Sequence, residues 1–185
     1  MKVTKTSLPG VLLIEPKVFD DGRGFFMESF SVARYAEIGI REAFVQDNVS
    51  RSGRGVLRGL HFQYPHTQSK LVWVLEGEVF DVAVDVRLGS PTFGRWCGEC
   101  LSGANKRQFY IPAGFAHGFV VTSETALFAY KCTDYYYPET ERSVRWDDPR
   151  IGIDWPTLNV ELSAKDREAP LLNAIAPDLL PPYAG

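Results

Sequence analysis

Residues 71–86 read LVWVLEGEVFDVAVDV, and this stretch decides the fold class. Residues 71–75 form a short, continuous apolar run, which is typical of a buried strand. Residues 79–86 alternate instead, with Phe80 and three valines on one face and two aspartates and an alanine on the other. The turn Glu76-Gly77-Glu78 joins the two runs, so we predict a β-hairpin.

Similar short runs recur on both sides of this stretch, between 16 glycines and 12 prolines. We predict strands at Val11–Ile14, Gly24–Phe30, Phe44–Ser50, Val56–Gln63, Arg107–Ile111, Gly118–Val121 and Leu127–Thr133. Helical signals are confined to Ser31–Gly39, which has a cap candidate and a stopping glycine, and to one turn near Ser163–Glu168. The pattern predicts a mainly β fold, an antiparallel sandwich or small barrel of the jelly-roll type, with a few short helices at its N- and C-terminal sides.

Length and composition indicate one globular domain. The chain has 185 residues, of which 45% are hydrophobic and 23% charged, enough for a sizeable core and too apolar for a disordered chain. We expect a single domain over residues 1–185, with a core of about 1–150 and an extension, 151–185, packed on it.

Charge and apolar runs exclude several classes of partner. The net charge is −3, from 20 basic and 23 acidic residues without a basic tract, so we expect no nucleic-acid binding. The longest apolar run, residues 71–75, is too short to span a bilayer. The opening MKVTKTSLPG has no secretory signal, and three cysteines, an odd number, suit a reduced compartment, so we expect a cytoplasmic protein.

A metal site is the first chemistry to consider, because the chain has a motif of metal-binding cupin barrels. Residues 112–117 match the second cupin motif, P-x-G-x-x-H, through His117. The first motif requires His-x-His followed by glutamate, but here His61 is followed by Gln63 and Gln68. Glutamine is a poor replacement for imidazole or carboxylate ligands, so we predict no metal. The single Cys-x-x-Cys at residues 97–100 is interpreted as incidental, since no second pair completes a zinc set.

Polar residues alternate along two neighbouring predicted strands. Gln46, Asn48 and Ser50 share one strand face by the period of two. They could line a pocket, although alternating polar residues more often mark a solvated face, and the pattern alone favours that interpretation. Arg58 and His61 are three residues apart and would point to opposite faces of an ideal strand; a bulge at Gly59 could re-aim one of them.

Seven short blocks of the sequence, taken in order, are informative. They are residues 21–30 (DGRGFFMESF), 46–48 (QDN), 56–63 (VLRGLHFQ), 90–94 (SPTFG), 111–119 (IPAGFAHGF), 130–136 (YKCTDYY) and 162–166 (LSAKD). Together they resemble the dTDP-4-dehydrorhamnose 3,5-epimerase family over nearly the whole chain. The resemblance implies a cupin-type jelly roll, a homodimer that exchanges N-terminal strands, a dTDP-sugar substrate, and no metal or cofactor.

The resemblance also implies a role for individual residues. His61 would be the general base with Asp166 behind it, and Tyr130 the opposing acid. Lys70 and Arg58 would lie near the substrate's C4 carbonyl and His117 in the sugar site. Further nucleotide or sugar contacts would come from Arg23, Glu28, Gln46, Asp47, Asn48, Glu141 and Lys165. Tyr136 would stack on the thymine, although the run Tyr135-Tyr136-Tyr137 leaves its two neighbours as alternatives.

The residue types suit this chemistry without reference to the family. Inverting a carbon next to a ketone requires a base and an acid on opposite sides of the substrate. Imidazole can remove the proton, a carboxylate can fix its tautomer, and a tyrosine is a neutral donor at pH 7. Negative charge develops on the ketone oxygen, where a fixed cation lowers the barrier.

Each catalytic residue has a purely structural alternative. Asp166 lies three residues after Ser163 and could complete a helix cap. Tyr130 shares a face with Phe128 and could belong to the core, and His61 between two apolar residues could be an interior histidine.

The resemblance therefore implies an isomerase that needs no cofactor and converts dTDP-4-keto-6-deoxy-D-glucose to dTDP-4-keto-L-rhamnose, in dTDP-L-rhamnose biosynthesis. The alternatives are an epimerase that inverts only C3 or C5 of a related nucleotide sugar, and a noncatalytic cupin that binds sugar nucleotides. A metal-dependent cupin oxygenase is disfavoured by the incomplete ligand set.

Overall fold

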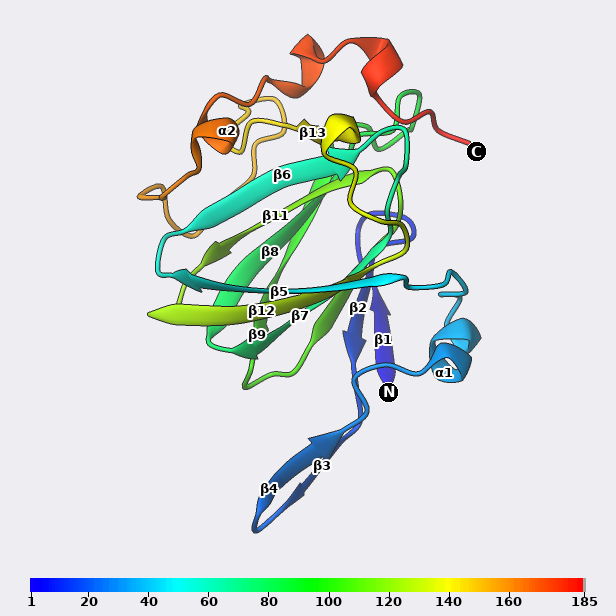
Figure 1. Cartoon of the computed structure of the whole chain (residues 1–185), viewed down its shortest axis with the longest axis vertical. Coiled ribbons are helices and arrows are strands. Elements are labelled where there is room, and N and C mark those ends of the chain that lie inside the picture. Colours follow the sequence, from blue (N-terminus) through cyan, green and yellow to red (C-terminus); the bar gives the residue numbers. More distant parts are fainter. Residues whose placement is uncertain (185) are drawn as a thin grey trace.

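The computed structural model describes residues 1–184, which form two antiparallel sheets stacked on one another (Figure 1). The first sheet has six strands, in the order β1 (Lys2–Lys5), β2 (Leu12–Glu15), β10 (Gln108–Ile111), β7 (Lys70–Glu76), β12 (Thr125–Cys132) and β5 (Gln46–Gly53). The second has five, in the order β13 (Glu141–Ser143), β6 (Leu57–Gln63), β11 (Phe115–Val121), β8 (Glu78–Asp85) and β9 (Trp96–Ser102). The predicted mainly β, antiparallel fold is confirmed.

The predicted hairpin across residues 76–78 is wrong. β7 lies in the six-stranded sheet between β10 and β12, whereas β8 lies in the five-stranded sheet between β11 and β9. Both edges of each strand are occupied by other partners, so the chain crosses from one sheet to the other at Gly77. That glycine has φ +79°, and a Cβ on it would lie 1.9 Å from the Thr125 carbonyl oxygen, so the tight crossing requires glycine.

Three apolar clusters explain why β7 and β8 are so hydrophobic. The inner cluster fills the space between the sheets and includes Val72 and Val74 of β7. Leu71 and Trp73, on the other face of β7, pack against Tyr35 and Ile40, outside the six-stranded sheet. A third cluster packs the outward valines of β8 against residues 144–180. Both strands are therefore buried on both faces, although only β7 has the continuous apolar pattern that predicts such burial.

The helices are short and close to their predicted places. α1 (Val32–Glu37) begins after Ser31, and α2 (Ala164–Arg167) begins after Ser163. Three 3-10 turns follow the main strands: η1 (Pro138–Thr140), η2 (Leu172–Ala174) and η3 (Pro177–Leu179). Across residues 1–184, no helix has the length and apolar character needed to cross a membrane.

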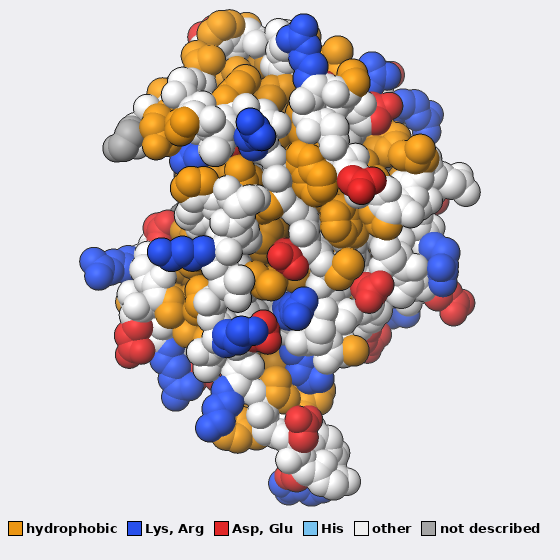
Figure 2. Space-filling model, turned by 180° about the vertical axis from the view of Figure 1, so that it is seen from behind, with side chains coloured by type: hydrophobic (Ala, Val, Ile, Leu, Met, Phe, Trp, Pro, Cys, Tyr) orange, Lys and Arg blue, Asp and Glu red, His pale blue; other side chains and the backbone are white. Residues whose placement is uncertain are grey.

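A two-stranded hairpin projects from the sandwich (Figure 1). It consists of β3 (Val18–Asp21) and β4 (Gly24–Met27), and it pairs with neither large sheet. Phe19, Phe25 and Phe26 on the hairpin are 52%, 57% and 70% exposed. The view from behind also shows the projection, and shows basic and acidic side chains interspersed over that face without a single-sign patch (Figure 2).

Candidate active site between the two sheets

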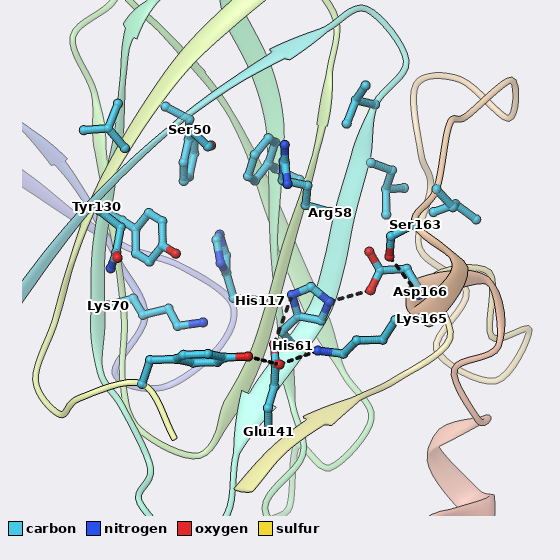
Figure 3. Close-up of a pocket in the computed structure, with 18 of the residues that line it drawn as sticks. Ser50, Arg58, His61, Lys70, His117, Tyr130, Glu141, Ser163, Lys165 and Asp166 are labelled. Carbon is cyan, nitrogen blue, oxygen red and sulfur yellow. Dashed lines mark hydrogen bonds and ion pairs between the residues drawn. The ribbon is translucent and has the colours of Figure 1, made fainter. Parts of the chain in front are cut away.

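A cavity of about 670 Å³ opens between the two sheets and the α2 segment (Figure 3). Its walls come from β5, β7 and β12 of one sheet, from β6 and β11 of the other, and from residues 161–166. A second cavity of about 300 Å³ shares His61, Lys70 and Tyr130 with the first. Polar groups from several distant segments therefore converge on one concave space, which is typical of a small-molecule site.

A β-bulge brings Arg58 and His61 to the wall of the same cavity. His117 of β11 lies opposite His61, and Phe119 lies opposite Arg58, so β6 has one residue more than its partner between the two pairs. Gly59 at the bulge has φ +125°, and a Cβ on it would lie 2.5 Å from the Cα of Gly118. Only glycine allows the strands to approach so closely here. The predicted bulge at Gly59 is confirmed.

His61 is hydrogen bonded to a carboxylate that lies 105 residues later in the chain. Its Nε2 atom is 2.5 Å from Oδ1 of Asp166, which is 3% exposed. The Ser163 hydroxyl accepts a hydrogen bond of 3.1 Å from the backbone N–H of Asp166. Asp166 therefore serves in the helix cap through its main chain and contacts His61 through its side chain, so the two interpretations are compatible.

The electrostatics of this pair fix the state of the imidazole. Burial acts to raise the pKa of Asp166, but the hydrogen bond and charge of His61, with the Ser163 hydroxyl, outweigh it and lower that pKa below its ordinary value. The carboxylate is therefore ionised at neutral pH and accepts from Nε2–H, which leaves Nδ1 of His61 free to accept a proton.

Glu141 lies on the free side of the His61 ring. Its Oε1 atom is 4.0 Å from Nδ1, and its carboxylate accepts a 2.8 Å hydrogen bond from the Tyr136 hydroxyl and forms an ion pair with Lys165 (Figure 3). Burial acts to raise the pKa of Glu141, but Lys165 and Tyr136 outweigh it and lower that pKa. The imidazole of His61 thus lies between two carboxylates, Asp166 on its Nε2 side and Glu141 on its Nδ1 side.

Tyr130 faces His61 from the opposite sheet (Figure 3). Burial, reinforced by Cys132 and Glu141, raises the pKa of Tyr130 above its ordinary value. The hydroxyl therefore stays protonated and remains a donor at neutral pH. The ring also packs against Phe128, at 6.0 Å between ring centroids, so Tyr130 is a core residue with its polar end in the cavity.

Two further polar groups lie between these walls. Lys70, from β7, extends into the space between Tyr130 and His61 (Figure 3). Burial lowers the pKa of Lys70, while Cys132, Glu141 and Asp81 act in the opposite direction. His117 donates through Nε2–H to both oxygens of the fully buried Asp81, at 3.0 and 2.9 Å. Burial lowers the pKa of His117, so its ring is neutral near pH 7.

The polar face of β5 lines the cavities and is not a solvated face. Asn48 and Ser50 line the larger cavity, and Gln46 and Asn48 line the smaller one. The interpretation that the alternation alone favoured is therefore wrong. The outer face of this strand carries Asp47 instead, whose side chain is 68% exposed and lines neither cavity.

Among the three consecutive tyrosines, only Tyr136 lines both cavities. Tyr137 stacks instead on His66, with ring centroids 4.2 Å apart, and Tyr135 is 56% exposed. This placement favours Tyr136 as the stacking residue, as the resemblance implied.

Three predicted contact residues are not brought into the cavities within one chain. Asp47 lies on the outer face of β5 and forms an ion pair of 2.9 Å with Lys131. Arg23, at the hairpin turn, pairs with Asp21, and its side chain is 91% exposed. Glu28 pairs with Arg34 at 3.2 Å.

Asp81, the carboxylate behind His117, was not predicted as a site residue. The alternation of residues 79–86 placed Asp81 on a polar face, whereas the structure buries it completely, where an unpaired carboxylate is costly. Its partner could not be read from the sequence, because Asp81 meets His117 only across the pairing of β8 with β11.

The two glutamines at the expected metal-ligand positions are hydrogen bonded to main-chain atoms. Gln63 donates to the carbonyls of His66 and Tyr135, and Gln68 donates to those of Asp134 and Tyr135. Over residues 1–184, no three His, Cys, Asp or Glu side chains cluster as a metal site would require. In β9, Cys97 is buried and Cys100 exposed, and both are free thiols.

Comparison with known proteins identifies close relatives. A family model described as dTDP-4-dehydrorhamnose 3,5-epimerase matches residues 5–174. A dTDP-4-dehydrorhamnose 3,5-epimerase from Pseudomonas aeruginosa is 59% identical over 170 residues, covering 91% of this chain and 94% of the relative. A dTDP-4-dehydrorhamnose 3-epimerase from Streptomyces niveus is 43% identical over 188 residues, covering 100% of this chain and 90% of the relative. The structure of a dTDP-6-deoxy-D-glucose-3,5-epimerase from Legionella pneumophila in complex with dTDP-4-keto-L-rhamnose superposes with a TM-score of 0.97 at 60% identity, covering 100% of this chain and 99% of that one.

Proposed function

The chain belongs to the dTDP-4-dehydrorhamnose 3,5-epimerase family and is an isomerase of dTDP-rhamnose biosynthesis, and we propose that the cavity between its sheets performs this epimerisation. The substrate is dTDP-4-keto-6-deoxy-D-glucose and the product dTDP-4-keto-L-rhamnose. The observation that carries the proposal is the placement of His61, bonded to Asp166, across the cavity from Tyr130.

His61 acts as the general base. Nδ1 accepts the proton from the carbon next to the C4 ketone, and the electron pair of the broken C–H bond forms the enolate. Asp166 holds the ring and stabilises the imidazolium, and Glu141 adds a second negative charge 4.0 Å from Nδ1. Lys70 and Arg58 stabilise the negative charge on the enolate oxygen, and His117 holds the sugar.

Tyr130 returns a proton to the opposite face of the same carbon. The electron pair of the enolate C=C bond takes the proton of the Tyr130 hydroxyl and forms the new C–H bond, which regenerates the ketone. Solvent then returns a proton to the tyrosinate oxygen. Because Tyr130 and His61 come from different sheets, removal and return take place on opposite sides of the sugar, which inverts the centre.

The remaining cavity residues hold the substrate. Tyr136 stacks on the thymine, and the other nucleotide and sugar contacts come from Gln46, Asn48, Glu141 and Lys165. Arg23, Glu28 and Asp47 contribute through a second subunit, because in one chain they lie away from the cavities. No metal takes part: the amides of Gln63 and Gln68 are already bonded to the main chain, and turnover should survive prolonged chelation.

The proposed assembly is a cytoplasmic homodimer of single-domain subunits. The hairpin exposes three phenylalanines, and β5 is an edge strand with Val49 exposed, so each offers an unpaired surface to a second copy. The extension beyond residue 150 packs on the outer face of the five-stranded sheet and should unfold with it in one calorimetric transition.

Proton NMR of the reaction in heavy water tests the activity. Inversion at both centres incorporates deuterium at C3 and C5 and yields the L-rhamnose configuration. Inversion at C3 alone, the activity named for the Streptomyces niveus relative, would replace the proposed reaction with a single-centre one. Binding without any deuterium uptake would contradict catalysis.

A further inference from the structure

Gln63 lies at the end of β6, two residues after His61, and is 5% exposed. Its amide nitrogen donates to the His66 carbonyl at 2.9 Å and to the Tyr135 carbonyl at 3.1 Å, and its amide oxygen accepts from the Tyr137 N–H at 2.9 Å. A glutamine side chain can donate through two N–H groups and accept through one oxygen. Each is engaged by the main chain, so Gln63 contributes no free donor to a substrate or a metal.

Two more glutamines bind the same short segment, residues 134–137. Gln68 donates to the carbonyls of Asp134 and Tyr135, at 2.7 and 3.0 Å. Gln46, in β5, accepts from the Tyr136 N–H at 3.0 Å. Glutamines from three separate places thus hold consecutive backbone groups of a segment that lies between β12 and η1 and has no sheet partner of its own.

The segment carries Tyr136, whose ring is 51% exposed and lines both cavities. Its main chain is fixed by glutamines, and its hydroxyl donates to Glu141 at 2.8 Å. Between these two anchors the ring has little freedom left. Ordering a mobile ring on binding costs free energy, so a ligand binds more tightly when the ring on which it stacks is already held in place.

We propose that Gln63 is a positioning residue for nucleotide binding, which acts through residues 134–137 by holding Tyr136 ready to stack on a pyrimidine base. This inference rests on the proposed function of Tyr136. Gln63 occupies the position of a metal ligand in the first cupin motif, but here it serves the nucleotide end of the site. Gln68, in the loop before β7, helps to hold the same segment by its bonds to the carbonyls of Asp134 and Tyr135.

Gln63→Met tests the proposal, because methionine has a similar length and no hydrogen-bonding amide. Loss of the three bonds should raise KM for the dTDP-sugar about tenfold. The dissociation constant of dTDP alone, from calorimetry, should rise to the same extent, whereas kcat stays within about twofold of wild type. In a Tyr136→Ala background, Gln63→Met should have no further effect on KM, since the ring it positions is gone.

Gln108→Met is the matched control. Gln108 is fully buried in β10, and its amide bonds the Ser29 carbonyl at 2.7 Å and the Tyr35 hydroxyl, outside both cavities. It should lower Tm without changing KM. If Gln63→Met yields no folded protein, Gln68→Met removes two bonds to the same segment from a half-buried position and should raise KM in the same direction by less.

The outcomes separate this inference from the function on which it rests. A wild-type KM and dTDP affinity for Gln63→Met, beside a raised KM for Tyr136→Ala, overturns the inference alone. A full KM effect of Gln63→Met in the Tyr136→Ala background overturns it as well, because Gln63 would then act by another route. A Tyr136→Ala enzyme with wild-type KM overturns the role of the ring, and the inference with it.

Discussion

At the scale of single residues, the proposed base and the proposed acid lie on opposite walls of the cavity and can be tested separately. Tyr130→Phe removes only a hydroxyl and leaves the ring packed against Phe128. Proton removal by His61 should continue, and deuterium should enter with retained configuration at C5, the centre that we assign to this pair. Inverted product should fall by on the order of 10²–10⁴. NMR in heavy water measures uptake and inversion together. Normal inversion by this variant would make water or another group the acid.

The control for this experiment is His61→Ala. It should abolish both deuterium uptake and turnover, since the proton acceptor itself is missing. Uptake that persists in His61→Ala would assign the base to a different residue.

Asp166 also contributes to stability, in a way that depends on pH. Its pKa in the folded protein is lowered, so its contribution is fully present above the unfolded value, ordinarily near 3.9, and is lost as the pH falls through the lower folded value. Asp166→Asn should therefore reduce the free energy of unfolding by about 1.5–3 kcal/mol at pH 6. The difference from wild type should shrink below pH 4. An equal difference at pH 6 and pH 3 would mean that the carboxylate charge is not involved.

Only part of the candidate site could be predicted from its residue types. The residue types at positions 61, 130 and 166 predicted acid–base chemistry, and the structure brings these three residues to one cavity. Which of three adjacent tyrosines faces the site could not be predicted, because it depends on glutamines distant in sequence that hold the segment. Asp47 was grouped with its neighbours Gln46 and Asn48, but a strand turns alternate residues to opposite faces, so Asp47 lies away from the cavities of its own chain.

At the scale of elements, the close approach of β6 to β11 holds His61, the proposed base, in place. Gly59→Ala would put a Cβ 2.5 Å from the Gly118 Cα and 2.7 Å from the His117 carbonyl oxygen, at a φ of +125°. We expect a loss of about 3 kcal/mol in stability, with kcat reduced because His61 follows directly on the displaced bulge.

Gly53→Ala is the matched control for Gly59→Ala. Gly53 is also in a strand, and a Cβ there would meet nothing within 4 Å. It should change stability by less than about 1 kcal/mol. Denaturant unfolding and steady-state kinetics compare the two, and equal effects would contradict the role given to the bulge.

The strands show why fold class was predictable while pairing was not. Period-two alternation and short apolar runs located β6, β7, β8 and β12, since burial on one or both faces leaves its mark on local sequence. Whether β7 pairs with β8 depends on β10, β12, β11 and β9, which occupy the available edges. β9 was not predicted from its sequence, WCGECLS. It has a glycine at the position that the Phe80 ring covers, so the strand lacks an apolar side chain there that would complete the alternation.

At the scale of the whole molecule, the hairpin predicts sites shared between subunits. If Arg23 serves the partner's cavity, then mixing Arg23→Ala with His61→Ala subunits should create dimers with one intact site. After complete exchange, half of the dimers are mixed, so activity should recover to about a quarter of wild type. Each variant alone, carried through the same exchange, is the control. Verified mixed dimers without recovered activity would refute shared sites.

The long separation between His61 and Asp166 has a consequence for the newborn protein. The ribosome adds about 5–20 residues per second, so the 105 residues between the two take roughly 5–20 s to synthesise. Every strand of both sheets precedes Asp166 in the chain, and a polypeptide released before that point lacks the carboxylate that we propose orients His61. Truncated translation products should therefore epimerise the nucleotide sugar poorly even where their sheets have assembled. The enzyme becomes competent only near the end of its own synthesis.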